Sequence, residues 1–361
     1  MKTVLEINLQ SLEHNFNKIK SLVKPATKTM AVVKANGYGS DMVAVAKKLE
    51  KLEVDYFSVA YASEGVKLRN AGIKTPILVL IPQTGSFDKI TNFDLEPSIY
   101  SFHFLNEFIE YTHEKNISNY PIHFKINSGL NRIGFKENEV EKAFELMSNS
   151  DTCFIKSIYS HLSASEDVNE KEFTLQQIKS FEKSIEKILP QLSHKPILHM
   201  SNTSGVVNYP ESEFDMVRCG IGLYGFSNKL SVNLEPVHKL LSTISQIIDV
   251  SKGESVGYNR AYMAKEEIRV GVIPLGHADG ISRSFNKGGY VVVNEKKCKI
   301  IGNVCMDVIM INLNDVAAKE GDQVVIFDEK NTAEEFADSV GTISYEILTN
   351  LSSRINRKII D

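Results

Sequence analysis

The residue that most directly indicates chemistry in this sequence is Lys34. Apolar residues, ending in Val32 and Val33, precede it, and Gly37 and Gly39 follow. If the apolar run is a barrel strand, the lysine faces the mouth of the barrel, where desolvation lowers its pKa and leaves part of it as free amine. A free amine can form a Schiff base with an aldehyde. The alternative is a solvated surface lysine beside a glycine turn.

Two later segments have compositions suited to a phosphate group. The segment 201–205 reads SNTSG and is rich in hydroxyl groups, and the segment 218–222 reads RCGIG and is rich in glycine. Barrel enzymes commonly bind phosphate in the loops after strands seven and eight, through backbone N–H groups and small hydroxyls. Ordinary turns would explain either segment alone. Together, opposite Lys34, they predict a phosphorylated aldehyde cofactor.

The elements that must position these residues follow a repeating pattern of short apolar runs and amphipathic helices, which is typical of parallel βα units. The predicted strands are Thr29–Val33, Tyr56–Tyr61, Pro76–Ile81, Leu95–Tyr100, Ile122–Ile126, Thr152–His161, Ile197–Met200 and Met216–Leu223. Eight such units predict a (β/α)8 barrel. The alternative, an open doubly wound sheet, lacks a G-x-G-x-x-G after its first strand.

Turn and capping residues delimit the helices. Asp41 is expected to cap a helix that begins at Met42. Ser63 is expected to cap the next helix, and Gly72 to end it.

The pattern changes after about Ser227, where short β-rich runs replace the βα units. The predicted elements include strands Ile268–Ile273, Tyr290–Val293, Lys299–Val304 and Gln323–Phe327 and a late helix Thr332–Val340, which Gly341 ends. We therefore expect a barrel domain over 1–232 and a mainly antiparallel β domain over 233–361, with the first ten residues pairing with the latter. The linker is expected over Ser227–Pro236.

Composition narrows the function classes. The chain has 361 residues, 42% hydrophobic, and a formal net charge of −4. A net negative charge does not favour the basic surface that a nucleic-acid-binding protein needs, so nucleic acid is not an expected partner. Glu6 interrupts any signal-peptide core, and no apolar run reaches the length of a membrane span. The four cysteines are widely scattered and include no C-x-x-C pair, which is typical of a protein in the reducing cytoplasm. No H-x-H or H-E-x-x-H spacing indicates a metal site.

Six segments, in order along the whole chain, resemble those of alanine racemases. These segments are 31–39, 125–134, 218–225, 256–260, 274–280 and 302–307. The resemblance implies a fold type III enzyme with a barrel and a C-terminal β domain, dependent on pyridoxal 5′-phosphate (PLP). It implies a homodimer with shared active sites that interconverts L- and D-alanine and supplies D-alanine for cell-wall peptidoglycan.

The resemblance also implies two acid–base groups, which racemisation needs on opposite faces of the substrate. These are Lys34, which also binds the cofactor, and Tyr258, which His161 and Arg218 would extend as a hydrogen-bonded relay. Because arginine only donates hydrogen bonds, Arg218 would meet an unprotonated pyridine nitrogen.

Further roles come from the same resemblance. Arg132 would contact the cofactor's phenolic oxygen and the substrate carboxylate, and Lys125 matches a lysine that is often carbamylated. Met306 would join Tyr258 in reaching the partner's site. The residues matched to cofactor and phosphate contacts are Tyr38, Asn202, Thr203, Gly220 and Ile221.

The sequence departs from the family pattern in three places. Asn127, Ser128 and Leu130 replace Asp, Thr and Met between Lys125 and Arg132. His277 stands where a tyrosine is usual, and Ser353 stands where some relatives have a tyrosine near the phosphate and the entrance. These changes leave open a broader racemase that accepts serine, for example. Weaker alternatives are a fold type III decarboxylase and a non-catalytic PLP-binding protein that resembles the barrel alone.

Overall fold

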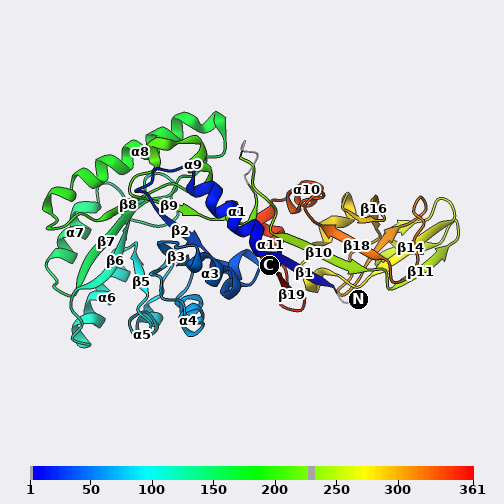
Figure 1. Ribbon diagram of the computed structural model, residues 1–361, viewed down its shortest axis with the longest axis horizontal. Coiled ribbons are helices and arrows are strands. Elements are labelled where there is room, and N and C mark those ends of the chain that lie inside the picture. The colour runs from blue at the N-terminus through cyan, green and yellow to red at the C-terminus, as the bar shows by residue number, and fades with distance from the viewer. Residues whose placement is uncertain (1–2, 227–231) are drawn as a thin grey trace.

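The computed structural model describes residues 3–226 and 232–361, and its first large unit is a closed barrel of eight parallel strands. Figure 1 shows this barrel beside a second, sheet-based unit. The barrel strands are β2 (Lys28–Val32), β3 (Tyr56–Val59), β4 (Ile77–Val79), β5 (Glu96–Ile99), β6 (Tyr120–Lys125), β7 (Cys153–Tyr159), β8 (Ile197–His199) and β9 (Met216–Cys219). The predicted (β/α)8 barrel is confirmed.

Alternation along the strands separates an inner from an outer layer. Met30, Tyr56, Leu78, Tyr159 and Met216, one from each of five strands, form an apolar cluster of their own. Their neighbours along the strands belong instead to the large core shared with the helices. Successive strand residues point to opposite faces, so the first set fills the barrel and the second packs outward.

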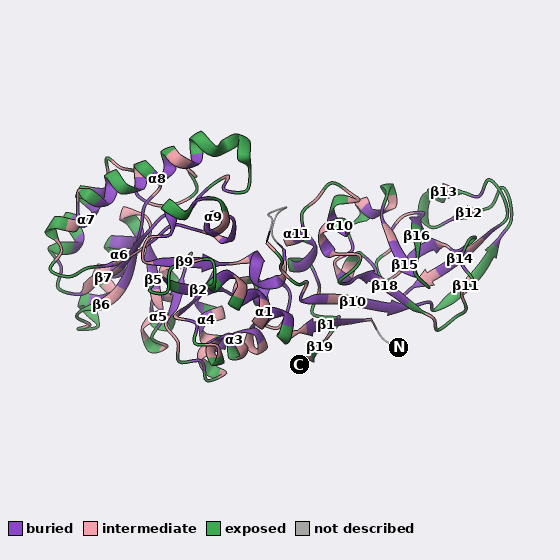
Figure 2. Ribbon diagram, turned by 45° about the horizontal axis from the view of Figure 1, so that its top comes forward, coloured by how far each residue is buried: buried purple, intermediate pink, exposed green. Residues whose placement is uncertain are grey.

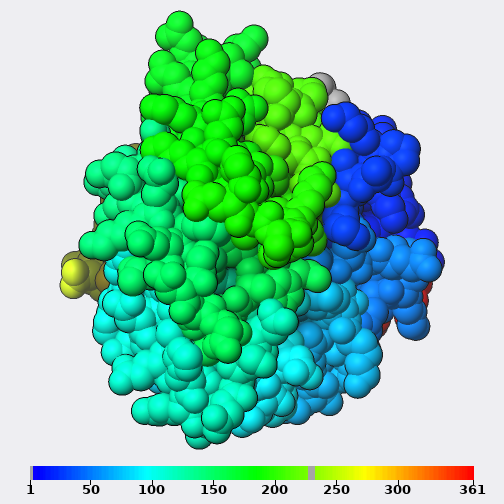
Figure 3. All heavy atoms as spheres, turned by 90° about the vertical axis from the view of Figure 1, so that its left-hand side faces the viewer, coloured from blue at the N-terminus to red at the C-terminus, as the bar shows by residue number. Residues whose placement is uncertain are grey.

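Helices cover the outside of the barrel. They are α1 (Leu9–Lys20), α3 (Met42–Lys51), α4 (Ala62–Asn70), α5 (Phe87–Asn92), α6 (Phe102–Glu114), α7 (Val140–Ser148), α8 (Lys171–Glu186) and α9 (Thr203–Asn208). Seen from the side turned away from the second unit, the chain runs round the barrel from blue through cyan to green (Figure 3). Among the described residues, no helix has the length and apolar composition needed to cross a bilayer.

Two of the three predicted helix-end residues are confirmed. Gly72, whose φ is +93°, comes directly after Ala71, the C-cap of α4. Asp41 caps α3 by accepting hydrogen bonds from the N–H groups of Val43 and Ala44. The prediction for Ser63 is wrong, because α4 begins one residue before it, at Ala62. Its N-cap is Tyr61, whose N–H donates to Glu64, three residues on, as in a capping box.

The second unit is a nine-stranded sheet with the order β11-β14-β17-β16-β15-β18-β10-β1-β19. All pairs are antiparallel except β1 with β19. The strands are β1 (Val4–Asn8), β10 (His238–Thr243), β11 (Gln246–Val250), β14 (Ile268–Ile273), β15 (Tyr290–Val293), β16 (Lys296–Ile301), β17 (Ile309–Asn312), β18 (Gln323–Phe327) and β19 (Asn356–Ile360). A short hairpin, β12 (Ser255–Val256) and β13 (Tyr262–Met263), stands apart from it.

The predicted strands at β14, β15 and β18 are confirmed, and the sheet also contains β10, β11, β17 and β19, which the sequence analysis did not name. The fourth predicted strand corresponds to β16, which ends at Ile301. The strand predicted over Lys299–Val304 begins at Lys296, because Asn294 and Glu295 both have positive φ and form a two-residue turn after β15. Part of the linker predicted over Ser227–Pro236, namely 227–231, lies outside the described residues.

Two short helices lie between the units, α10 (Ala333–Asp338) and α11 (Ser344–Thr349). The helix predicted over Thr332–Val340 corresponds to α10, which Thr332 caps. Helix α11 packs against the segment α2 (Lys34–Tyr38) at the barrel mouth, and Arg357 donates to the Gly39 carbonyl. Figure 2 shows buried residues continuing from the barrel through α11 into the sheet.

Gly39 is where this contact is tightest, and we expect Gly39→Ala to lower the free energy of unfolding by about 3 kcal/mol. Its φ is +79°, and an added Cβ would lie 1.8 Å from the Leu348 carbonyl oxygen. Gly72 also has a positive φ but no atom within 4 Å of an added Cβ, so Gly72→Ala should cost only about 1 kcal/mol of backbone strain. Urea denaturation measures both. Equal losses would show that the contact with α11 is unimportant.

Candidate active site

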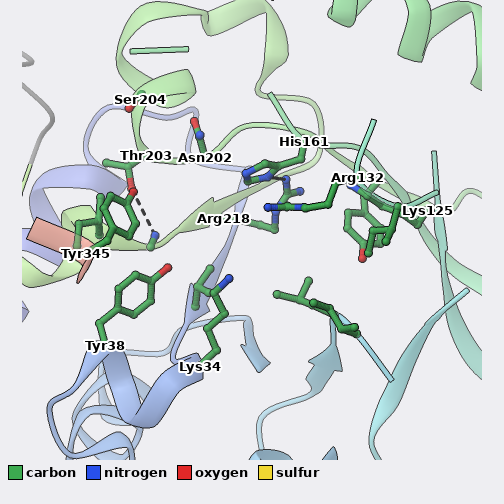
Figure 4. Close-up of a pocket in the computed structure, with 17 residues that line it drawn as sticks. Lys34, Tyr38, Lys125, Arg132, His161, Asn202, Thr203, Ser204, Arg218 and Tyr345 are labelled. Atoms are coloured by element: carbon green, nitrogen blue, oxygen red, sulfur yellow. Dashed lines mark hydrogen bonds between the residues drawn. The ribbon is translucent and has the colours of Figure 1, made fainter. Parts of the chain in front are cut away.

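A cavity of about 370 Å³ lies at the carboxyl ends of the barrel strands, with Lys34 between its two ends (Figure 4). Tyr38, Thr203 and Tyr345 lie toward one end in this view, and Arg132 and Lys125 toward the other. The sequence-predicted residues that line it are Lys34, Tyr38, Lys125, Arg132, His161, Asn202, Thr203, Arg218, Gly220 and Ile221. The fold therefore brings ten predicted side chains or backbone segments to one place.

Lys34 follows β2 and begins a turn in which Ala35, Asn36 and Gly37 all have left-handed φ and ψ. The Glu64 carboxylate holds this turn by accepting from the Ala35 N–H at 2.7 Å, and it accepts from Ala60 as well. Burial, and next the charge of Arg132, lower the pKa of Lys34, which Glu64 partly opposes. The amine is thus more readily unprotonated than a solvated lysine. Sequence reasoning missed Glu64.

The end of the cavity near Tyr38 presents hydroxyl and backbone N–H groups. Thr203 Oγ1 accepts from the N–H groups of Gly220 and Gly222 at 3.3 and 3.4 Å, which leaves its own hydrogen to donate. The Tyr38 hydroxyl lies so close to Gly220 that a Cβ there would approach it to 2.9 Å. Such a cluster of donors suits an anion. Asn202 lines the same end, but its side-chain oxygen caps α9 through the Gly205 N–H.

A tyrosine from α11 completes this end. Tyr345 lines the cavity, and its ring centroid lies 5.9 Å from that of Tyr38. Ser353, which the sequence pattern placed near the phosphate and the entrance, is exposed and does not line the cavity. Sequence reasoning missed Tyr345, because nothing in its local sequence reveals that α11 reaches the barrel mouth.

The other end is built on Arg218, which is buried. Its Nη1 donates to His199 Nδ1 at 2.7 Å, and its Nη2 donates to His161 Nδ1 at 2.9 Å and to two backbone carbonyls. Since arginine has no acceptor, His161 Nδ1 must be the unprotonated nitrogen, and Nε2 carries the hydrogen. Burial, and next the Arg218 charge, hold the pKa of His161 well below its usual value. His161 is therefore a neutral donor.

Lys125 is buried near the positive charges of Arg218 and Arg132. Its Nζ lies 4.4 Å from the centroid of the Tyr159 ring, and none of the ion pairs among the described residues involves it. Burial, and next the charges of Arg218 and Arg132, hold its pKa well below the usual value. An unpaired buried ammonium is costly, so the neutral amine is favoured.

The departures after Lys125 keep the loop hydrogen-bonded. The Asn127 side-chain oxygen accepts from the N–H groups of Gly129 and Asn131, and the Ser128 hydroxyl bonds Ser160. The replacements thus preserve support for the turn that leads to Arg132.

Tyr258 and Met306 do not approach this cavity. Their side chains are 73% and 58% exposed, and neither lines it. Both lie on the second unit, where Asn303 donates to the Tyr258 carbonyl and the N–H of Ala278 donates to the Met306 carbonyl. His277, also exposed, lies beside them through its bond to the Cys305 carbonyl. One chain therefore does not bring Tyr258 to Lys34.

Comparisons with known proteins follow the same division into two units. The family model "Alanine racemase, N-terminal domain" matches residues 7–228, and "Alanine racemase, C-terminal domain" matches residues 237–359. The alanine racemase of Thermodesulfovibrio yellowstonii is 36% identical, with 98% of this chain and 97% of the relative covered. The similarity thus extends beyond the barrel alone.

Solved structures agree with this. The alanine racemase of Clostridium difficile 630 superposes with a TM-score of 0.92 at 32% identity, covering 100% of this chain and 96% of that chain. The alanine racemase of Bartonella henselae, with covalently bound pyridoxal phosphate, gives a TM-score of 0.91 at 26% identity, with both chains fully covered.

Proposed function

The chain belongs to the alanine racemase family, and from this premise we propose that it is a PLP-dependent enzyme that interconverts L- and D-alanine. The observation that carries the proposal is the position of Lys34, a half-buried amine of lowered pKa between a cluster of anion-binding donors and a pair of arginines. We further propose that the protein is cytoplasmic and supplies D-alanine for the cell wall.

The cavity suits PLP at each of its parts. The Lys34 amine would bind the cofactor's aldehyde carbon. Tyr38, Thr203 and the backbone at Gly220 and Ile221 would hold the phosphate. A side chain at position 220 would collide with the Tyr38 hydroxyl, so the glycine keeps this hydroxyl in place at the phosphate end. When bound, PLP draws electrons from the α-carbon of the amino acid and so acidifies its hydrogen.

Arg218 would face the pyridine nitrogen. Its hydrogen bonds among the described residues use its two terminal nitrogens, so its Nε–H remains available for the cofactor. As a donor without acceptor capacity, it would leave the ring nitrogen unprotonated and keep the cofactor a moderate electron acceptor. Arg132, which lines the cavity from the loop after β6, would hold the substrate carboxylate with its planar guanidinium.

The second base would come from another copy of the chain. Tyr258 and Met306 are both exposed and lie outside the cavity of their own chain. We therefore propose a homodimer in which each chain completes the other's active site. The neutral His161 would donate its Nε2–H to the Tyr258 oxygen and stabilise the phenolate. Lys34 and Tyr258 would then remove and return the α-proton from opposite faces.

The test of this function is direct. The purified protein is incubated with PLP and L-alanine, and then with D-alanine, and the product is analysed by chiral chromatography. Both reactions should reach the same mixture of enantiomers. Parallel incubation with L-serine tests the broader specificity, and release of carbon dioxide would identify a decarboxylase. If PLP binds but no amino acid changes configuration, the proposal fails.

We also propose that Lys125 is carbamylated. Its neutral amine would attack carbon dioxide and lose a proton, and the resulting carbamate would place a negative charge near Arg132 and Arg218, which now lower the pKa of Lys125. In 13C-labelled bicarbonate, the protein should show a carbamate resonance that Lys125→Ala abolishes. A resonance of equal intensity in that variant would contradict the assignment.

A further inference from the structure

A row of buried polar side chains continues from Arg218 through the inside of the barrel. Arg218 Nη1 meets His199 Nδ1 at 2.7 Å, and His199 Nε2 meets the Ser157 hydroxyl at 2.9 Å. Ser157 meets His123 Nδ1, and His123 Nε2 lies 2.6 Å from the Glu96 carboxylate. We call this row, from Glu96 to Arg218, the interior chain. It links four barrel strands, β5, β6, β7 and β8, to β9.

The two ends of the interior chain determine the direction of every hydrogen bond in it. Arg218 can only donate, so His199 Nδ1 is an acceptor and its hydrogen sits on Nε2. That hydrogen goes to Ser157. The Ser157 hydroxyl has no other acceptor among the described residues, so it donates to His123 Nδ1.

The direction of the last hydrogen bond, between His123 and Glu96, follows in the same way. With Nδ1 as acceptor, His123 carries its hydrogen on Nε2 and donates it to the Glu96 carboxylate, which can only accept while ionised. Both histidines are then neutral, each with its hydrogen on Nε2. All four hydrogen bonds of the row then point from the arginine to the carboxylate.

The buried Arg218 guanidinium needs a negative charge to balance its own, and the interior chain connects it to one. Its guanidinium is buried with Arg132 as a cationic neighbour, and none of its hydrogen bonds among the described residues reaches a carboxylate. A buried charge normally needs a counter-charge. The Glu96 carboxylate, whose side chain is 13% exposed, is the anionic end of the row. Hydrogen bonds in series polarise one another, so its charge is felt along the row.

We propose that Glu96 is a positioning residue for Arg218. It fixes the tautomers of the interior chain and thereby the orientation in which the guanidinium faces the cavity. This rests on the proposed function in one respect, because Arg218 is taken to face the pyridine nitrogen of PLP. Glu96 touches neither substrate nor cofactor and acts only through the row.

The first experiment needs neither turnover nor a variant of Glu96. In the holoenzyme with 15N-labelled histidine rings, the His199 and His123 signals, assigned with His199→Asn and His123→Asn, should both show neutral rings protonated on Nε2. A hydrogen on Nδ1 of His199, or a charged His123, would overturn the proposal, because the direction of the row would then be different.

The second experiment breaks the row in its middle. Ser157→Ala should lower kcat about tenfold with little change in the KM for alanine, as for other residues that orient a catalytic group. The matched control is Ser58→Ala, a buried barrel serine whose hydroxyl has no partner among the described residues. It should leave kcat, KM and the His199 signal unchanged. If Ser157→Ala behaves like the control, the row does not position Arg218.

Glu96→Gln separates charge from hydrogen bonding. The amide oxygen can still accept from His123, so both tautomers should persist, while kcat falls and KM stays. An unchanged kcat would show that the Glu96 charge does not act on Arg218 and would overturn its assignment. Failure of the proposed function is distinguishable: a wild-type protein that binds PLP without racemising alanine refutes the function, whereas the histidine tautomers still test the row.

Discussion

Tyr258→Phe is expected to lower racemisation in both directions by about 10²–10⁴-fold, which is the usual contribution of a general base. The variant keeps the aromatic ring and removes only the hydroxyl that would carry the proton. Tyr258 is 73% exposed in the single chain, so the loss should not come from a disturbed core. Initial rates with each enantiomer give the measurement. The matched control is Tyr262→Phe, a tyrosine of β13 close by in the sequence, which should retain activity.

Isotope exchange shows which of the two bases removes the α-hydrogen of each enantiomer. In deuterated water, Tyr258→Phe should still exchange the α-hydrogen of D-alanine through Lys34, with retention of configuration, while exchange from L-alanine nearly stops. Equal loss from both enantiomers would count against two bases, and full racemisation would remove Tyr258 from the mechanism.

Lys34→Ala should lose activity to below detection, since the change removes both the attachment point of the cofactor and one of the two bases. Borohydride treatment of the wild type should leave a reduced pyridoxyl group on Lys34 alone, located by peptide mass spectrometry, and the variant should show none. Lys67→Ala is the control, because Lys67 contacts the same turn through Asn36 but is not among the residues that line the cavity. A pyridoxyl group on another lysine of the wild type would refute the attachment site.

The barrel could be predicted because each of its strands is a short apolar run flanked by helical periodicity, and the ends of parallel strands converge. This is why Lys34, Thr203 and Arg218, far apart in the sequence, could be placed together before the fold was known. Burial is the main cause of the lowered pKa values of Lys34 and Lys125. The sequence indicates this burial only when the apolar run before each lysine is recognised as a barrel strand.

Other parts of the site depend on tertiary contacts that leave no local signal. Tyr345 comes from a six-residue helix, and its role depends on how α11 packs on α2. Glu64 acts on a turn 29 residues earlier. Ser157 resembles any strand serine until His123 and His199 from neighbouring strands meet its hydroxyl. Sequence patterns predict elements well and side-chain networks poorly.

The sharing of one active site by two chains is the central claim, and mixing two inactive variants tests it most directly. Lys34→Ala and Tyr258→Phe are combined, allowed to exchange subunits, and assayed with L-alanine. Each heterodimer would contain one pocket with both residues intact, so random exchange should restore about a quarter of wild-type activity. A mixture that stays inactive although mass spectrometry shows heterodimers would contradict the account.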